Sequence, residues 1–266
     1  MNSKSLTFLD WAFALLAWVL PAQAAPVMPS FDGAPAGWVV DRYEPDSFGD
    51  VGSYAGRDNV LAIGISSVDG LGSRPAAYQS SFYNTQGMQH AISGGMGSVL
   101  SAALYIPSSW ANSQLGHVRT DMWGVMTNGT SVTDYPIIGF TNYDGAPRLR
   151  LWDDASWVDL GVAINYDDWT DLSITFTGTS YIYKVNGVEA HVDNTINGST
   201  GFSAAIMQGY NFCGDTSLAN AVCNSYTAHW SNSQEGSQVP TPASVPLVML
   251  ALMAGAYVRR YGNNKK

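Results

Sequence analysis

The sequence predicts an all-β protein, specifically an antiparallel two-sheet sandwich of the jelly-roll type. Two observations of composition support this. Residues 26–238 contain three glutamates and a single lysine, Lys184, whereas the chain as a whole has 27 glycines, 14 tyrosines and 9 tryptophans. Glu and Lys favour helices, aromatic residues favour strands, and glycine favours tight turns. A third observation, the alternation of apolar and polar residues, identifies the individual strands.

Twelve short runs have the character of strands. Leu172 and Ile174 alternate with serine and threonine, which is the period of two expected for a half-buried strand. Asn186 and Gly187 separate two such runs and predict a two-residue hairpin turn. The runs from 137 to 192 follow one another as an antiparallel meander. The expected strands are 37–43, 59–66, 98–106, 118–127, 137–143, 148–152, 157–160, 172–177, 181–185, 188–192, 202–208 and 226–230.

Residues 69–97 interrupt this pattern. They are rich in Gly, Ser, Gln and Asn and alternate poorly. We expect a long surface excursion from the sandwich, in which binding residues often lie.

The amino-terminal residues 1–24 have the order of parts of a signal peptide. A weakly basic start precedes an apolar stretch, and Ala22 and Ala24 form the small-x-small pattern that signal peptidase accepts. We expect an apolar helix here and cleavage between Ala24 and Ala25. An uncleaved anchor helix is the alternative.

The carboxyl-terminal residues 239–266 combine a proline-rich motif, an apolar run and a basic tail. The motif and the basic pair are Val239, Pro240, Thr241, Pro242, Ala243, Arg259 and Arg260. The apolar run at 245–258 predicts a helix, but its 14 residues are fewer than the roughly 20 that span a bilayer. The run therefore predicts a weak or temporary anchor whose basic tail stays on the cytoplasmic side.

This ending resembles the PEP-CTERM sorting domain of Gram-negative bacteria, whose motif is Val-Pro-Glu-Pro. Thr241 stands where that family usually has glutamate. The resemblance implies recognition by an exosortase-type membrane peptidase. It also implies transient insertion in the inner membrane facing the periplasm, followed by delivery to the cell surface or the extracellular matrix. The resulting division is a signal peptide at 1–24, a passenger at 25–231, a linker at 232–238 and a sorting signal at 239–266.

A second resemblance lies within the meander. The matching residues are Trp169, Leu172, Ile174, Val185, Asn186 and Gly187. They are similar to the W-x-x-L-x-I strand and V-N-G hairpin of the laminin-G and concanavalin A-like jelly roll, and so imply that fold. The residues we expect to interlock between its sheets are Leu172, Ile174, Ile182 and Val185.

The charge of the passenger excludes one class of partner. Between residues 26 and 238 there are 7 basic and 20 acidic residues, a net charge of −13. Binding to nucleic acid requires clustered Lys and Arg that neutralise phosphates. We expect no nucleic-acid partner. Cys213 and Cys223 are the only cysteines, and in an exported chain they predict a disulfide that closes the loop 214–222.

The sequence contains no recognised catalytic pattern. Glycoside hydrolysis requires two carboxyl groups, and the glucanase branch of the resembled fold carries them as Glu-x-Asp-x-x-Glu, which is absent here. A Gly-x-Ser-x-Gly elbow is absent as well. We therefore expect a non-catalytic protein without cofactor or metal. Asp144, Asp153 and Asp154 could bind calcium, but their positions also suit ordinary turn residues.

Carbohydrate binding is the sharper functional hypothesis. The candidate residues are Trp152, Trp157, Tyr143, Asp153 and Asp154. Aromatic planes pack on sugar rings and carboxylates bind hydroxyls, although aromatic side chains also dominate sandwich cores. The sequence thus predicts a non-catalytic surface or matrix protein that binds extracellular polysaccharide. The alternatives are a purely structural, adhesive matrix protein of a biofilm and a glycoside hydrolase of the concanavalin A-like fold.

Overall fold

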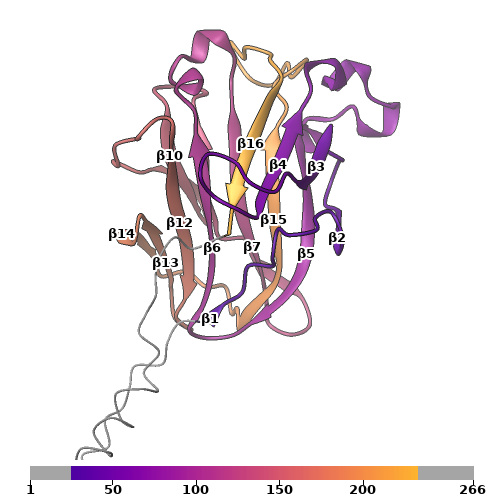
Figure 1. Cartoon of the computed structure of the whole chain (residues 1–266). Helices are drawn as coiled ribbons and strands as arrows, with labels where there is room; N and C mark the ends of the chain where they lie inside the picture. The colour runs from indigo at the N-terminus through magenta and orange to yellow at the C-terminus, as the bar shows by residue number, and fades with distance from the viewer. Residues whose placement is uncertain (1–24, 233–266) are drawn as a thin grey trace, which may run out of the picture.

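The computed structural model describes residues 25–232, which fold as two sheets packed face to face (Figure 1). We call them sheet A and sheet B. Neighbouring strands are antiparallel within both sheets, except that β1 (Ala25–Pro26) runs parallel to β6. The prediction of an all-β, antiparallel two-sheet sandwich is confirmed.

Sheet A has the order β14-β13-β12-β6-β16-β4-β3, with β1 beside β6. Its strands are β3 (Ser47–Asp50), β4 (Val60–Ile65), β6 (Ser98–Ile106), β12 (Asp168–Phe176), β13 (Tyr181–Val185), β14 (Val188–Asp193) and β16 (Tyr226–Ser231). Asn186 and Gly187, which join β13 to β14, both have positive φ, at 50° and 76°. The predicted hairpin turn is therefore present.

Sheet B has the order β11-β10-β9-β7-β15-β5-β2, with β8 beside β7. Its strands are β2 (Trp38–Val40), β5 (Thr85–Gly94), β7 (Arg119–Thr127), β8 (Val132–Asp134), β9 (Ile137–Thr141), β10 (Arg148–Asp153), β11 (Ser156–Asp159) and β15 (Gly201–Tyr210). Strand β7 lies at the centre of this order, with three strands on each side along the path.

The segment 69–97 differs from its prediction. Its second half is β5, which pairs with β15 over most of its length. Polar residues and Gly87 obscure the strand pattern because one face of β5 does not meet the core. Short 3-10 turns precede it and recur later, at η1 (Ser67–Asp69), η2 (Leu71–Ser73), η3 (Ala76–Tyr78), η4 (Ser81–Asn84), η5 (Ser108–Ala111) and η6 (Ser113–Leu115).

The main core lies between the sheets. Leu172 and Ile174 on β12 are fully buried there, as predicted, and so is Val185 on β13. Ile182 does not join them, because it pairs with Thr175 on the outward side of sheet A. Tyr181 and Tyr183 occupy the inward positions of β13 instead. Ile182 and Val185 are three residues apart, so a strand must direct them to opposite faces.

No helix within residues 25–232 is long and apolar enough to cross a membrane. The signal peptide with Ala22 and Ala24, and the sorting motif with its apolar helix at 245–258, lie outside the described residues. Their structures therefore remain predictions from the sequence.

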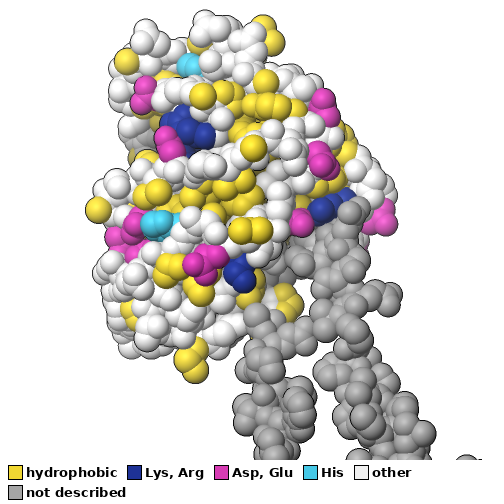
Figure 2. Space-filling model, turned by 90° about the vertical axis from the view of Figure 1, so that its left-hand side faces the viewer, with side chains coloured by type: hydrophobic (Ala, Val, Ile, Leu, Met, Phe, Trp, Pro, Cys, Tyr) yellow, Lys and Arg dark blue, Asp and Glu magenta, His cyan; other side chains and the backbone are white. Residues whose placement is uncertain are grey.

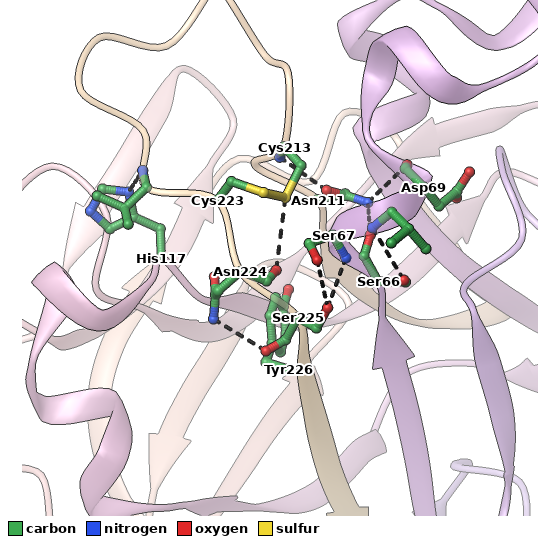
Figure 3. Close-up of a disulfide and its surroundings, with 12 residues drawn as sticks. Ser66, Ser67, Asp69, His117, Asn211, Cys213, Cys223, Asn224, Ser225 and Tyr226 are labelled. Carbon is green, nitrogen blue, oxygen red and sulfur yellow. Dashed lines mark hydrogen bonds between the residues drawn. A yellow bond between two sulfur atoms is a disulfide. The ribbon is translucent and has the colours of Figure 1, made fainter.

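The predicted disulfide between Cys213 and Cys223 is present (Figure 3). Two further contacts hold its loop to the sandwich. Asn211 donates from Nδ2 to the carbonyl oxygens of Ser66 and Asp69, at 2.9 and 3.1 Å. His117 Nδ1 accepts from the backbone N–H of Val222 at 2.8 Å. The loop between β15 and β16 is thus fixed at both ends.

Replacing both cysteines by serine should lower the free energy of unfolding by about 2–3 kcal/mol, the loop-entropy value for a ring of this size. Urea denaturation of wild-type and variant protein measures the difference. Wild-type protein treated with a reductant is the matched control and should unfold like the variant. A difference below about 0.5 kcal/mol between oxidised wild type and variant would contradict this entropic role.

Candidate functional site

Strand β7 presents one set of side chains away from the core, on the outer face of sheet B. Met122 points inward and belongs to the main core. Its neighbours Asp121 and Trp123 therefore point outward, and so does Arg119, because side chains alternate along a strand. Because β7 is central, these three residues lie in the middle of the outer face, which we call the site face.

A row of polar residues crosses the site face beside Asp121. The register aligns Asp159, Arg150, Gly139, Asp121, Gln208 and Gly87 on six adjacent strands. We call this set the middle row. Its members come from sequence positions 87 to 208, and only strand pairing brings them together.

Asp121 is the fully buried carboxylate of the middle row. Its Oδ2 accepts from Arg119 Nε at 2.6 Å and from Gln208 Nε2 at 2.7 Å. Its Oδ1 is buried and accepts no hydrogen bond from any described residue. The two donors therefore fix the orientation of the carboxylate, while Oδ1 is left without a hydrogen-bond donor among the described residues.

Two glycines of the middle row let Asp121 and Gln208 pack directly against the backbone of the neighbouring strands. A Cβ atom at Gly139 would collide with Asp121 Oδ1 and the carbonyl oxygen of Thr120. A Cβ atom at Gly87 would collide with Gln208. The sequence places glycine where backbone and functional side chain approach most closely.

A second, mostly apolar row of outward-facing side chains lies two residues away from the middle row along each strand. The register aligns Trp157, Trp152, Ile137, Trp123, Ile206 and Gln89 on the same strands. The rings of Trp152 and Trp157, both predicted to bind carbohydrate, lie 5.5 Å apart between centroids. They pack against a second hydrophobic cluster, separate from the main core, that includes Trp123 and Ile206. Three tryptophans and two isoleucines thus form an apolar strip across the site face, which we call the aromatic strip.

Three arginines gather on the site face. Arg150 belongs to the middle row, and Arg119 and Arg148 lie on the side of that row away from the apolar row. The guanidinium of Arg150 lies 3.7 Å from the ring centroid of Trp157, and that of Arg119 lies 4.8 Å from the same ring. Arg148 donates from Nε to Asp159 at 2.7 Å. Burial lowers the pKa of Arg150 to about 10, and the charge of Asp121 opposes this shift. Arg150 is nevertheless cationic at neutral pH.

A pocket of about 230 Å³ opens above these arginines. Arg119 and Arg150 form its base together with Trp157, and Tyr210 and Phe212 contribute to its walls. Phe212 lies next to Cys213, so the disulfide loop supplies this wall. The pocket therefore joins a cationic base to aromatic sides.

Asp41 extends the middle row at the edge of the sheet. Its backbone N–H donates to the carbonyl oxygen of Gly87 at 3.1 Å, which continues the pairing of β2 with β5. Its Oδ2 is buried without a hydrogen-bond partner among the described residues. Burial raises the pKa of Asp41, and the nearby charge of Arg42 partly offsets this. Asp121 is thus a fully buried carboxyl group and Asp41 a half-buried one on the same face.

The other predicted carbohydrate residues lie away from this row. Asp153 alternates with Trp152 and points between the sheets, where it contacts His191 Nε2 at 2.9 Å. Asp154 accepts from Asn197 at 3.1 Å. Tyr143 reaches the pocket, and its hydroxyl donates to the carbonyl oxygen of Ala219 at 3.0 Å. Of the five predicted residues, Trp152 and Trp157 thus lie in the strip and Tyr143 lines the pocket, whereas Asp153 and Asp154 lie at the end of β10 and belong to neither.

The calcium candidates are also separated. Asp144 lies in the turn before β10 with a φ of 54°, whereas Asp153 and Asp154 follow the other end of that strand. Within residues 25–232 no group of three or more His, Cys, Asp or Glu side chains has an arrangement suited to a metal ion. Asp144 and Asp154 are turn residues with positive φ, whereas Asp153 is the last residue of β10.

The side of the molecule at the left of Figure 1 carries β10, β13 and β14 and is seen face-on in Figure 2. Hydrophobic side chains there lie between basic and acidic ones. The surface near the end of the aromatic strip therefore combines apolar area with charge.

No known family profile matches the chain, and no curated protein is similar to it in sequence. Several solved structures are similar in fold. A Bacillus licheniformis β-glucanase has 11% identity and a TM-score of 0.45, covering 78% of this chain and 97% of its own. An endo-acting O-glycanase of the human gut microbiota has 13% identity and a TM-score of 0.49, covering 76% and 94%. A Bacteroides ovatus glycoside hydrolase for mixed-linkage glucan, solved with its product, has 11% identity and a TM-score of 0.48, covering 76% and 97%.

These similarities concern the fold. The structures named above are glycoside hydrolases, and our expectation of a non-catalytic protein is withdrawn. The expectation rested on the absence of a Glu-x-Asp-x-x-Glu pattern within one strand. It did not consider carboxyl groups that strand pairing brings together from separate strands.

Proposed function

We propose that this protein is a glycoside hydrolase that acts on polysaccharide along the site face, with Asp41 and Asp121 as its two carboxyl groups. The observation that carries the proposal is Asp121 Oδ1, a buried carboxylate oxygen without a partner among the described residues, at the centre of an aromatic face. A sugar chain that packs on the aromatic strip would pass directly over it.

Hydrolysis of a glycosidic bond needs one carboxyl group that donates a proton and one that activates water. Asp41 suits the acid, because burial raises its pKa and favours the protonated form. Asp121 suits the base, because Arg119 and Gln208 hold Oδ2 and leave Oδ1 to accept a proton from water. Each role thus follows from the surroundings of the carboxyl group.

The position of the two residues favours inversion at the anomeric carbon. Strands β15 and β5 lie between β7 and β2, so three strand spacings of ~4.8 Å separate the backbones by about 14 Å. Gly87 contributes no side chain to this gap. Inverting enzymes hold their carboxyl groups ~6.5–9.5 Å apart, whereas retaining enzymes need ~5–5.5 Å. A backbone separation of about 14 Å is too wide for the retaining distance and reaches the inverting range only if both side chains lean toward each other, so inversion is the outcome that this pair permits.

The first test incubates the protein with a panel of neutral and acidic polysaccharides and measures the release of reducing ends. Asp41→Asn and Asp121→Asn should each lower the rate by at least about 100-fold, the usual contribution of a general acid or base. Asp159→Asn is the matched control, since it removes an exposed carboxylate bound to Arg148 at the edge of the same row. It should keep most of the activity.

Nuclear magnetic resonance of the fresh product should show the inverted anomer. Activity should also fall as the pH rises through the raised pKa of Asp41, because the acid then loses its proton. Absence of reducing ends from every polysaccharide would refute the proposal. Full activity of a folded Asp41→Asn or Asp121→Asn variant would refute these assignments.

We further propose that the chain is exported and then sorted to the cell surface or matrix by an exosortase-type peptidase. The order of proline motif, apolar run and Arg259-Arg260 supports this. Intact-mass analysis of the secreted protein should show a chain that begins at Ala25 and lacks the basic tail. A mature chain that keeps its last residues would argue against the sorting step.

A further inference from the structure

We infer that the pocket over Arg119 and Arg150 binds an anionic group on the saccharide, so that the substrate is an acidic polysaccharide bearing carboxylate or sulfate. This inference rests on the proposed function, in that the ligand is taken to be a sugar chain on the site face. It adds the chemical class of that chain.

The distribution of charge is the first argument. Residues 26–238 contain 7 basic residues against 20 acidic ones. Three of those 7 lie on the site face, Arg119 on β7 and Arg148 and Arg150 on β10, with β9 between the two strands. An acidic protein that gathers so many of its scarce arginines at one place creates a local site for an anion.

Arg150 is the second argument, because it is the arginine whose charge is not paired. Arg119 is bound to Asp121 and Arg148 to Asp159. Arg150 is 9% exposed, makes no ion pair with a described residue, and its Nε has no hydrogen-bond partner there. The charges of Asp121 and Asp159 favour the cationic form of Arg150 but form no ion pair with it. A buried guanidinium whose Nε lacks an acceptor is suited to a ligand that accepts from it.

The geometry of Arg150 is the third argument. Stacking on Trp157 at 3.7 Å fixes the plane of the guanidinium. A planar guanidinium held in this way offers paired N–H donors to a carboxylate or sulfate. Tyr210 and Phe212 line the same pocket and present aromatic surface to the apolar face of a sugar ring. Anion and ring would thus be recognised together.

Calorimetric titration tests the inference without relying on catalysis. The probes are trigalacturonate, its neutral trimethyl ester and a sulfated oligosaccharide, each added to the full-length Asp121→Asn protein and to wild type. We expect the acidic trisaccharide or the sulfated one to bind at least tenfold more tightly than the ester. The two acidic arms show whether carboxylate or sulfate supplies the charge.

Arg150→Gln should reduce that binding at least tenfold, and Arg150→Lys should restore only part of it, because an ammonium lacks the planar fork. The matched control is Arg57→Gln, which removes an arginine stacked on Trp169 at 5.1 Å on sheet A. It should bind like its parent. Thermal unfolding of each variant shows that it is folded.

Equal binding of the ester and the acids, binding of none of them, or unchanged binding by folded Arg150→Gln would overturn the inference. Its failure is separable from failure of the hydrolase. Binding without cleavage of any polysaccharide would refute the hydrolase and keep the anion site. Cleavage of neutral polysaccharide alone would refute the anion site and keep the hydrolase.

Discussion

Replacing Trp230 by alanine should lower the free energy of unfolding by about 3–5 kcal/mol, the range for large-to-small changes of buried aromatic residues. Trp230 on β16 is fully buried between the sheets. Its removal would leave a cavity in the most rigid part of the sandwich, and the surrounding strands could fill it only in part. Urea denaturation followed by circular dichroism measures the effect.

Trp230 also supports Asp121 and Gln208 from the core side of sheet B. Trp230 Nε1 donates to Thr120 Oγ1 at 3.0 Å, and Thr120 Oγ1 donates to the carbonyl oxygen of Gln208 at 2.8 Å. Thr120 precedes Asp121 in the chain. This path joins β16 in sheet A to the two strands that carry Asp121 and Gln208, so the cavity should also loosen the carboxylate.

Trp230→Phe is the matched control for the hydrogen bond. It keeps a six-membered aromatic ring but removes the N–H with the rest of the five-membered ring. The change should cost about 1–3 kcal/mol, less than Trp230→Ala, because Thr120 retains its other bond. Trp152→Ala, a change to a half-buried residue on the site face, should cost less than Trp230→Ala. A loss below about 1 kcal/mol for Trp230→Ala would contradict this account of the core.

The strands were predictable because local signals determine them. Alternation along β12 and the Asn186-Gly187 turn depend on neighbouring residues, and both appear in the structure where the sequence indicates. Strand β5 was missed because Gly87 and several polar residues occupy its outer face, so the strand lacks the expected contrast between faces. We expected Ile182 on the same face as Val185. Residues three apart in a strand point to opposite faces, so that prediction was wrong.

The site was harder to predict because it depends on register between distant segments. Alternation in β7 already places Arg119, Asp121 and Trp123 on one face, and this signal could have been used. The position of Gln208 next to Asp121, and of Asp41 in the same row, follows from the order β7-β15-β5-β2, which no local pattern reveals. The sequence shows that arginine is rare in the passenger. That three arginines cluster on the site face follows only from the pairing of β7, β9 and β10.

Asp134 lies at another buried acidic position, at the end of β8 between the two sheets. Its Oδ1 accepts from the backbone N–H of Tyr135 at 2.7 Å. Its Oδ2 and the Oδ2 of Asp154 are both buried and receive no hydrogen bond from a described donor. Burial raises the pKa of Asp134 to about 7, and the negative charge of Asp154 adds to the increase. A proton on Asp134 would satisfy both carboxyl groups.

Asp134 should therefore make the protein less stable as the pH rises from about 4 to about 7. Its folded-state pKa of about 7 exceeds the unfolded value of 3.8, so the folded protein binds the proton more tightly between these limits. The contribution is fully present below pH 3.8 and lost above pH 7, and it amounts to about 4 kcal/mol at most.

Asp134→Asn mimics the protonated carboxyl group and should remove this dependence. The variant should be about 2–4 kcal/mol more stable than wild type at pH 8, and close to wild type at pH 4. Urea denaturation at both pH values measures the two differences, and Asp32→Asn, which removes an exposed carboxylate, is the control. Equal gains for Asp134→Asn at pH 4 and pH 8 would show that packing, rather than the proton shared with Asp154, determines the effect.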